Sequence, residues 1–158
     1  MSRLVGSMVP DALAELLNGV DLDRKVGLTV ELLTVGDEGW PNVALLSAGE
    51  VVVVGPREVR VALWPDSQTS RNLAAREQCT LTLVQGGAAH YLRCRAAAPM
   101  PLELATGRRL ARFDMTVIHY LVDEVAYARL ESGAVFSLAQ PDQTLATWRR
   151  TIDALGLQ

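Results

Sequence analysis

The sequence predicts a small antiparallel β-barrel with peripheral helices, and three observations favour that fold class. Short apolar and β-branched runs follow one another along the chain, first at residues 27–35, 40–47, 50–54 and 59–64. Their links are shorter than the dozen or so residues that a parallel connection needs, so we expect hairpins in an antiparallel meander. The composition, 49% hydrophobic and 21% charged, is typical of a packed soluble protein. At 158 residues, the chain is expected to form one domain over residues 1–158.

A short helix is predicted ahead of these strands, over residues 10–19. Pro10 suits a first helical turn, because its missing N–H group would be unpaired there anyway. Gly19 is a natural stop for the helix. The leucines expected to share one face are Leu13, Leu16 and Leu17.

A second short helix is predicted between two strands, over residues 67–76. The start of this helix contains three hydroxyl side chains, Ser67, Thr69 and Ser70, followed by Arg71. The first N–H groups of a helix are unpaired and carry a positive dipole, so these side chains predict a phosphate site. The alternative is helix capping, for which Ser and Thr are preferred anyway. Asn72 either bonds a ligand or ties this loop to the barrel.

The second half of the chain predicts further strands and two helices. Residues 79–84 and 91–96 alternate apolar and polar positions, with Gly86-Gly87 as the turn between them. The later elements are predicted as a helix over 101–113, strands over 125–130 and 134–138, and a helix over 142–155. The residues expected to line one face of that last helix are Leu145, Trp148, Ile152 and Leu155.

Composition and residue spacing exclude several classes of protein. A net charge of −3 and a pI near 5.4 argue against a nucleic-acid binder. No apolar run reaches the ~18 residues of a membrane helix, and no signal-peptide pattern is present, so we expect a cytoplasmic location. Cys79 and Cys94 are expected to be buried, reduced thiols. His90 and His119 lack a carboxylate or cysteine at metal-ligand spacing, so no metal site is predicted, and His119 is expected to be packed or paired structurally rather than catalytic.

The order and spacing of these motifs resemble the FMN-binding split-barrel proteins of the pyridoxamine 5'-phosphate oxidase type. The similarity begins in Asp-Glu-Gly-Trp-Pro-Asn-Val at residues 37–43, which resembles the family's D-x-G-x-P turn and the strand along the flavin ring. It continues to Ser-Gln-Thr-Ser-Arg-Asn-Leu at residues 67–73, where the family commonly has Ser/Thr, Lys/Arg and Asn-Leu. The resemblance covers residues 26–138.

This resemblance implies an antiparallel split β-barrel that forms a homodimer, with FMN at the subunit interface. The phosphate would fall to the residues at the start of the 67–76 helix, and the backbone of residues 43–47 would run beside the isoalloxazine. The cofactor-binding residues implied are Ser67, Gln68, Thr69, Ser70, Arg71, Asn72, Val43, Leu45 and Ser47. The sequence does not show which residues of the partner subunit would complete the site; Trp148 and the Arg149-Arg150 pair are candidates.

Departures from the family pattern narrow the expected activity. Residues 42–46 lack the arginine that pyridoxamine-phosphate oxidases carry there, and Thr69 stands near the position of a basic residue. No counterpart of their C-terminal Arg and His segment follows residue 138. We therefore expect a flavin-dependent oxidoreductase acting on a small molecule, rather than the vitamin-B6 reaction. The alternative is a non-enzymatic carrier of flavin, deazaflavin or haem, or an empty site on the same fold.

The remaining candidates each have two interpretations. Trp64, at the end of a predicted strand, either stacks near a ring system or fills the core as a half-buried aromatic. Arg93 and Arg95 lie two residues apart on one strand face, where they either meet an anionic ligand or form a surface stripe paired with acids. Asp123 and Glu124 are expected to be a solvated pair, since adjacent strand residues face opposite ways.

Overall fold

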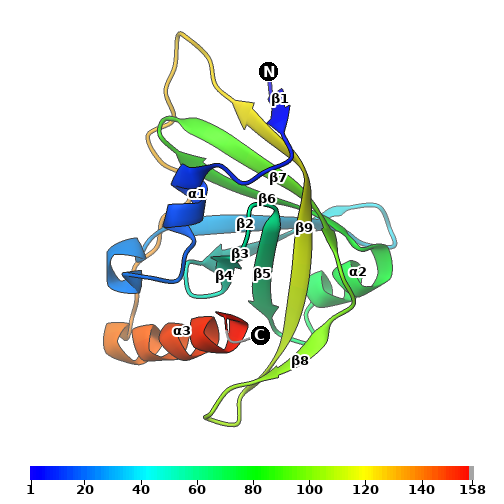
Figure 1. Ribbon diagram of the computed structural model, residues 1–158, viewed down its shortest axis with the longest axis vertical. Coiled ribbons are helices and arrows are strands. Elements are labelled where there is room, and N and C mark those ends of the chain that lie inside the picture. The colour runs from blue at the N-terminus through cyan, green and yellow to red at the C-terminus, as the bar shows by residue number, and fades with distance from the viewer. Residues whose placement is uncertain (157–158) are drawn as a thin grey trace.

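One curled antiparallel sheet dominates the fold, with helices at its edges (Figure 1). The computed structural model describes residues 1–156 of the chain. The strands are β1 (Arg3–Gly6), β2 (Thr29–Val35), β3 (Pro41–Ser47), β4 (Val51–Val53), β5 (Glu58–Leu63), β6 (Gln78–Gln85), β7 (Ala88–Ala96), β8 (Met100–Glu103) and β9 (Arg109–Asp123). The helices are α1 (Asp11–Leu16), the 3-10 helix η1 (Leu22–Lys25), α2 (Gln68–Arg76) and α3 (Pro141–Gly156). The predicted mainly-β class with peripheral helices is confirmed.

The sheet is open between β3 and β4. The strand order is β3-β2-β6-β7-β9-β5-β4, with β1 and β8 paired to β9, and every pairing is antiparallel. The predicted simple meander is therefore wrong, because β3 and β4 are consecutive in sequence but lie at opposite ends of this order. Only residues 48–50 join them, so the curl of the sheet brings its two end strands close together without pairing them.

The helix predicted over residues 101–113 is wrong, because this segment forms a β-hairpin. Leu102 of β8 lies directly opposite Leu110 of β9. Apolar residues that suggested a helical face by their spacing are thus cross-strand partners instead. Gly107, at φ +82°, makes the turn between the two strands in a conformation that favours glycine.

The strands predicted over residues 125–130 and 134–138 are also absent from the described structure. Only an isolated bridge between Val125 and Ala128 forms there. Phe136 meets Trp148 edge to face, with ring centroids 6.2 Å apart. Phe136 and Leu138 therefore contribute to the packing under α3 rather than to the sheet, whereas Tyr127 and Val135 are exposed.

Two apolar clusters hold the fold together. The larger lies inside the curl and contains fully buried side chains from several strands, among them Leu32, Leu81, Leu92 and Phe113. The smaller lies between α3 and the barrel, and includes Trp148, Ile152 and Leu155. Three of the four residues predicted to line the inner face of the last helix are thus buried, while Leu145 is half-buried.

Two glycines allow α3 to approach the barrel closely. A Cβ at Gly49 would lie 2.0 Å from Cγ of Trp148, and one at Gly19 would lie 2.3 Å from Cγ2 of Ile152. Both distances are far shorter than van der Waals contact, so side chains of α3 rest directly on glycine backbone. This packing fixes α3 beside the link between β3 and β4. Figure 1 shows α3 below β4.

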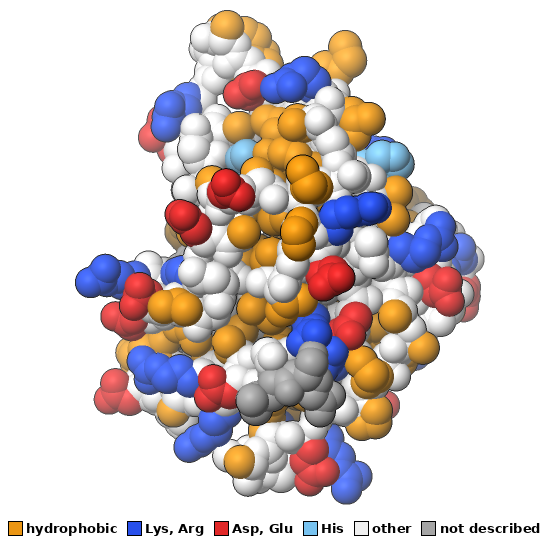
Figure 2. All heavy atoms as spheres, viewed as in Figure 1, with side chains coloured by type: hydrophobic (Ala, Val, Ile, Leu, Met, Phe, Trp, Pro, Cys, Tyr) orange, Lys and Arg blue, Asp and Glu red, His pale blue; other side chains and the backbone are white. Residues whose placement is uncertain are grey.

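The surface carries charges of both signs. Figure 2 shows Lys and Arg scattered among Asp and Glu over one face, with hydrophobic side chains gathered near its middle.

Cys79 and Cys94 are buried free thiols, as predicted, and they lie opposite each other on β6 and β7. Among residues 1–156, no helix is long and apolar enough to cross a membrane.

Candidate ligand-binding cleft

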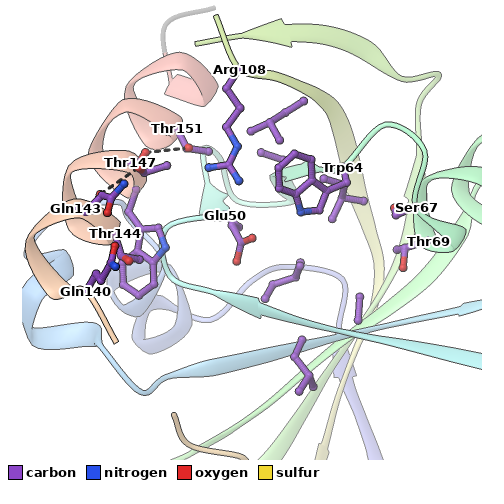
Figure 3. A pocket seen from close by; sticks show the side chains of 17 residues that line it. Glu50, Trp64, Ser67, Thr69, Arg108, Gln140, Gln143, Thr144, Thr147 and Thr151 are labelled. Carbon is purple, nitrogen blue, oxygen red and sulfur yellow. Dashed lines mark hydrogen bonds between the residues drawn. The ribbon is translucent and has the colours of Figure 1, made fainter. Parts of the chain in front are cut away.

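A cleft of about 500 Å³ lies where the sheet is open, at the point where the chain leaves β3 for β4. Its walls are β3, the end of β5, the start of α2, the β8–β9 turn and one face of α3. In Figure 3, the polar side chains of α3 lie on the left and Ser67 and Thr69 on the right. Arg108 and Trp64 lie between them, with Glu50 below. This size is within the range of small-molecule and cofactor sites.

The start of α2 offers one free hydroxyl donor to the cleft. Ser67 caps the helix, because its Oγ accepts from the backbone N–H of Ser70 at 3.1 Å, and the Ser70 hydroxyl donates to the carbonyl of Trp64 at 2.7 Å. Capping thus accounts for two of the three hydroxyls. Thr69 Oγ1 accepts from Asn42 Nδ2 at 3.0 Å, which leaves its own O–H to donate to a ligand.

Three other predicted residues of this segment point away from the cleft. Asn72 is buried and donates to Thr34 Oγ1 at 3.0 Å, so it ties α2 to β2. Gln68 donates to Asn72 Oδ1 at 2.7 Å. Arg71 bonds the Asp66 carbonyl and Gln68 Oε1, and it lines a separate hollow beside β8 with Ser70. Residues that are neighbours in sequence thus line two different surfaces. Ser67 and Thr69 face the cleft, whereas Ser70 and Arg71 line the other hollow.

An indole and a guanidinium form one wall of the cleft. Trp64 is exposed, and the guanidinium carbon of Arg108 lies 4.3 Å from its ring centroid, a cation–π geometry. Trp64 is therefore available for stacking rather than part of the core. Arg108 was not among the predicted site residues, since nothing in the β8–β9 turn marks it in the sequence.

A carboxylate stands at the other end of β3. Both the backbone N–H and the hydroxyl of Ser47 donate to Glu50 Oε2, at 2.7 and 2.8 Å. Ser47 was predicted to contact a cofactor, but it is buried and acts on the cleft through Glu50. The sequence holds a signal for this pair, because Ser-x-x-Glu spacing is the one that lets a Ser and a Glu hydrogen-bond reciprocally.

The strand β3 presents an apolar surface to the outside. Val43 is 53% exposed and Leu45 is 64% exposed, and the two share a face because they lie two residues apart. Leu45 lines the cleft, whereas Val43 lies nearer the start of the strand, outside it. Since β3 ends the sheet, its outer edge has unpaired backbone groups.

The opposite wall is a polar stripe along α3. Thr147 and Thr151 donate their hydroxyls to carbonyls one turn back, at 3.1 and 3.0 Å, so toward a ligand they act as acceptors. The α3 side chains that line the cleft are Gln140, Gln143, Thr144, Thr147, Trp148 and Thr151. Trp148, predicted as a contribution to a partner's site, lies in the cleft of its own chain.

A second hollow, of about 740 Å³, lies on the outer face of the sheet over β6, β7 and β9. Arg93 and His119 lie opposite each other on β7 and β9, and both are exposed. The prediction that His119 is packed is wrong, because its position on β9 faces outward. His90 is the packed histidine, bonded to Tyr120 at 2.8 Å and to the Gln85 carbonyl at 2.9 Å. In the described part of the chain, no group of three or more His, Cys, Asp or Glu could hold a metal ion.

A curated relative places the chain in a family. The uncharacterized protein YclD of Bacillus subtilis (strain 168) is 34% identical over 145 residues, which cover 92% of this chain and 94% of YclD. This chain belongs to the family of YclD. No protein-family model matches it.

Solved structures resemble this YclD-family protein in fold at low sequence identity. A Lactobacillus delbrueckii protein, provisionally described as a pyridoxamine 5'-phosphate oxidase, gives a TM-score of 0.57 at 14% identity, over 76% of this chain and 98% of that one. A protein named F420 reductase gives 0.54 at 16% identity, over 71% and 98%. A haem-binding protein from Mycobacterium smegmatis gives 0.50 at 16% identity, over 87% and 61%. The resemblance to the split barrels of the pyridoxamine 5'-phosphate oxidase type is thereby confirmed at the level of the fold.

Proposed function

We propose that the cleft of this YclD-family protein binds FMN, and that the protein transfers hydride or electrons between the flavin and a small molecule. The observation that carries the proposal is the free Thr69 hydroxyl at the start of α2, at one end of an exposed apolar strand. A helix N-terminus with a hydroxyl donor suits a phosphate, and an apolar strand face suits a flat ring.

The residues present fit such a cofactor. Thr69 and the capped turn at Ser67 would hold the phosphate, with Arg108 as the cation that faces the same cleft. Leu45 and Trp64 would contact the ring. The bound flavin supplies the redox chemistry, and the chain supplies binding, orientation and electrostatics. A deazaflavin has the same overall shape and is the alternative ligand for this cleft.

The proposal includes a homodimer with the cofactor at the subunit interface. It is supported by the apolar surface beside the free edge of β3, where Trp40, Val43 and Leu45 are all exposed. A second copy would cover these side chains and exclude water from the cleft. Buried reduced thiols at Cys79 and Cys94 suit the cytoplasm, where we place the protein.

A fluorescence titration with FMN and riboflavin tests the phosphate assignment. We expect FMN to bind more tightly than riboflavin, and Thr69→Val to remove most of that difference, because the valine keeps the shape and loses the O–H donor. Arg108→Ala should also weaken FMN binding. Arg71→Ala should leave it unchanged, since Arg71 lines the neighbouring hollow. Failure of the protein to bind FMN would overturn the proposal. If Arg71→Ala alone lost FMN binding, the phosphate would instead lie on the other side of α2.

A second candidate, haem binding, rests on the hollow over β6, β7 and β9. There an exposed histidine, His119, stands opposite Arg93, with Arg76 and Arg95 in the same lining. Imidazole is a common axial ligand of haem iron, and arginines pair with carboxylates. A haem titration should then give a shifted Soret band that His119→Ala removes and that FMN does not compete away. An unperturbed haem spectrum would eliminate this candidate.

A further inference from the structure

Two polar groups that line the cleft, the hydroxyl of Thr69 and the carboxylate of Glu50, are each hydrogen-bonded to one end of β3. At the start of the strand, Asn42 donates to Thr69. At its end, Ser47 donates twice to Glu50. Five residue steps separate Asn42 from Ser47, so the two anchors lie about 17 Å apart along the strand. The Thr69 hydroxyl and the Glu50 carboxylate are thus bonded to strand positions whose spacing is comparable to the length of an extended FMN molecule.

The carboxylate of Glu50 is oriented by its own chain. Oε2 accepts both hydrogen bonds from Ser47, which leaves Oε1 to accept from a ligand in the cleft. The backbone carbonyl of Glu50 also accepts from the N–H of Ala62 at 2.9 Å, which fixes the residue against β5. An ionised carboxylate can only accept hydrogen bonds, so Glu50 selects for a ligand that presents an N–H or O–H group at this end.

We propose that Glu50 accepts a hydrogen bond from N3–H of the isoalloxazine, and thereby recognises the pyrimidine end of the flavin. This inference rests on the proposed function, with the phosphate at Thr69. The oxidised flavin ring carries a single N–H group, at N3, at the end of the molecule that lies away from the phosphate. Glu50 is a recognition residue in this arrangement, and Ser47 positions its carboxylate.

Two consequences follow from a carboxylate at this position. A ligand without the N–H leaves Oε1 of Glu50 without its hydrogen bond in the cleft, so wild-type protein discriminates strongly against a flavin methylated at N3. A fixed negative charge near the ring also disfavours the uptake of electrons. Glu50→Gln keeps the size of the side chain and loses the charge, and it is expected to raise the midpoint potential of bound FMN.

The test is a binding titration with FMN and with N3-methyl-FMN. Wild-type protein should bind the methylated flavin at least about tenfold more weakly, which corresponds to one charged hydrogen bond. Glu50→Ala should bind both flavins equally. Glu131→Ala, which removes an exposed carboxylate outside the cleft, should keep the wild-type discrimination. Thermal unfolding of each variant verifies that it folds.

The outcomes separate this inference from the proposed function. If wild-type protein binds FMN and N3-methyl-FMN equally, or if Glu50→Gln leaves the midpoint potential of bound FMN unchanged, Glu50 does not contact N3–H and the inference fails alone. If neither flavin binds, the proposed function fails and this inference falls with it.

Discussion

Arg112 and Asp114 lie two positions apart on β9 and form a bidentate ion pair at 2.7 and 2.8 Å. The guanidinium of Arg112 is buried, and Arg60 approaches the same carboxylate at 3.7 Å. The hydrogen bonds from Arg112, followed by the charges of both arginines, lower the pKa of Asp114 below its ordinary value, against the opposing effect of burial. The pair also supports the end of α3, because Arg60 donates to the carbonyl of Leu155 at 2.7 Å.

The lowered pKa of Asp114 predicts how stability depends on pH. A depressed pKa means that the pair stabilises the fold above the ordinary aspartate pKa of about 4, and that this contribution disappears as the pH falls through the lower pKa of the folded state. Asp114→Asn should lower the free energy of unfolding at pH 7 by about 1 kcal/mol, since solvent screens a carboxylate that is 36% exposed. The stability of this variant should also fall less steeply than that of the wild-type protein as the pH drops below 4. Urea unfolding across this range is the measurement, with exposed Asp153→Asn as the control; equal pH profiles for the two variants would contradict the account.

The position of α3 depends on contact between side chains and glycine backbone at residues 19 and 49. Gly49→Ala places a methyl group against Trp148, whose ring lines the cleft and cannot move without disturbing α3. We expect a loss of about 1–3 kcal/mol in unfolding free energy, the usual cost of overpacking. Thermal unfolding measures it. Gly6→Ala is a matched control because a Cβ there meets nothing within 4 Å. Equal effects of the two substitutions would mean that α3 is not held by this contact.

Sequence reasoning worked best where local chemistry decides the structure. The cap of α2 followed from Ser67, and the β2–β3 hairpin followed from the short link between the runs at residues 27–35 and 40–47. It failed for residues 101–113, because Leu102 and Leu110 satisfy both a helical spacing and a cross-strand pairing. Only the long-range pairing of β9 with β5 and β7 decides between them.

The candidate cleft was predictable only in part, for a related reason. Ser67, Thr69 and Leu45 lie near each other because β3 and α2 are adjacent, as the family resemblance implied. Glu50, Arg108 and the α3 wall come together only through the open sheet and the packing of the last helix. No local sequence pattern around Arg108 predicts that its guanidinium lies over the Trp64 ring.

At the scale of the whole molecule, the open sheet leaves an exposed apolar edge that the proposed homodimer would cover. Val43→Lys places a charge there, and it should shift the protein toward the monomer in size-exclusion chromatography with light scattering. Leu4→Lys is the control, since Leu4 is comparably exposed but lies on β1, away from β3. A wild-type protein that stays monomeric at all concentrations would contradict the dimer.

The central claim is that the cleft at the open edge of the barrel holds a flavin. The absorbance spectrum of the purified protein, before and after incubation with FMN and removal of the free cofactor, tests it most directly. Purified protein should show the two visible bands of oxidised flavin at a stoichiometry of about one per chain, with mass spectrometry identifying FMN in the released ligand. A colourless protein that retains no added FMN would contradict it.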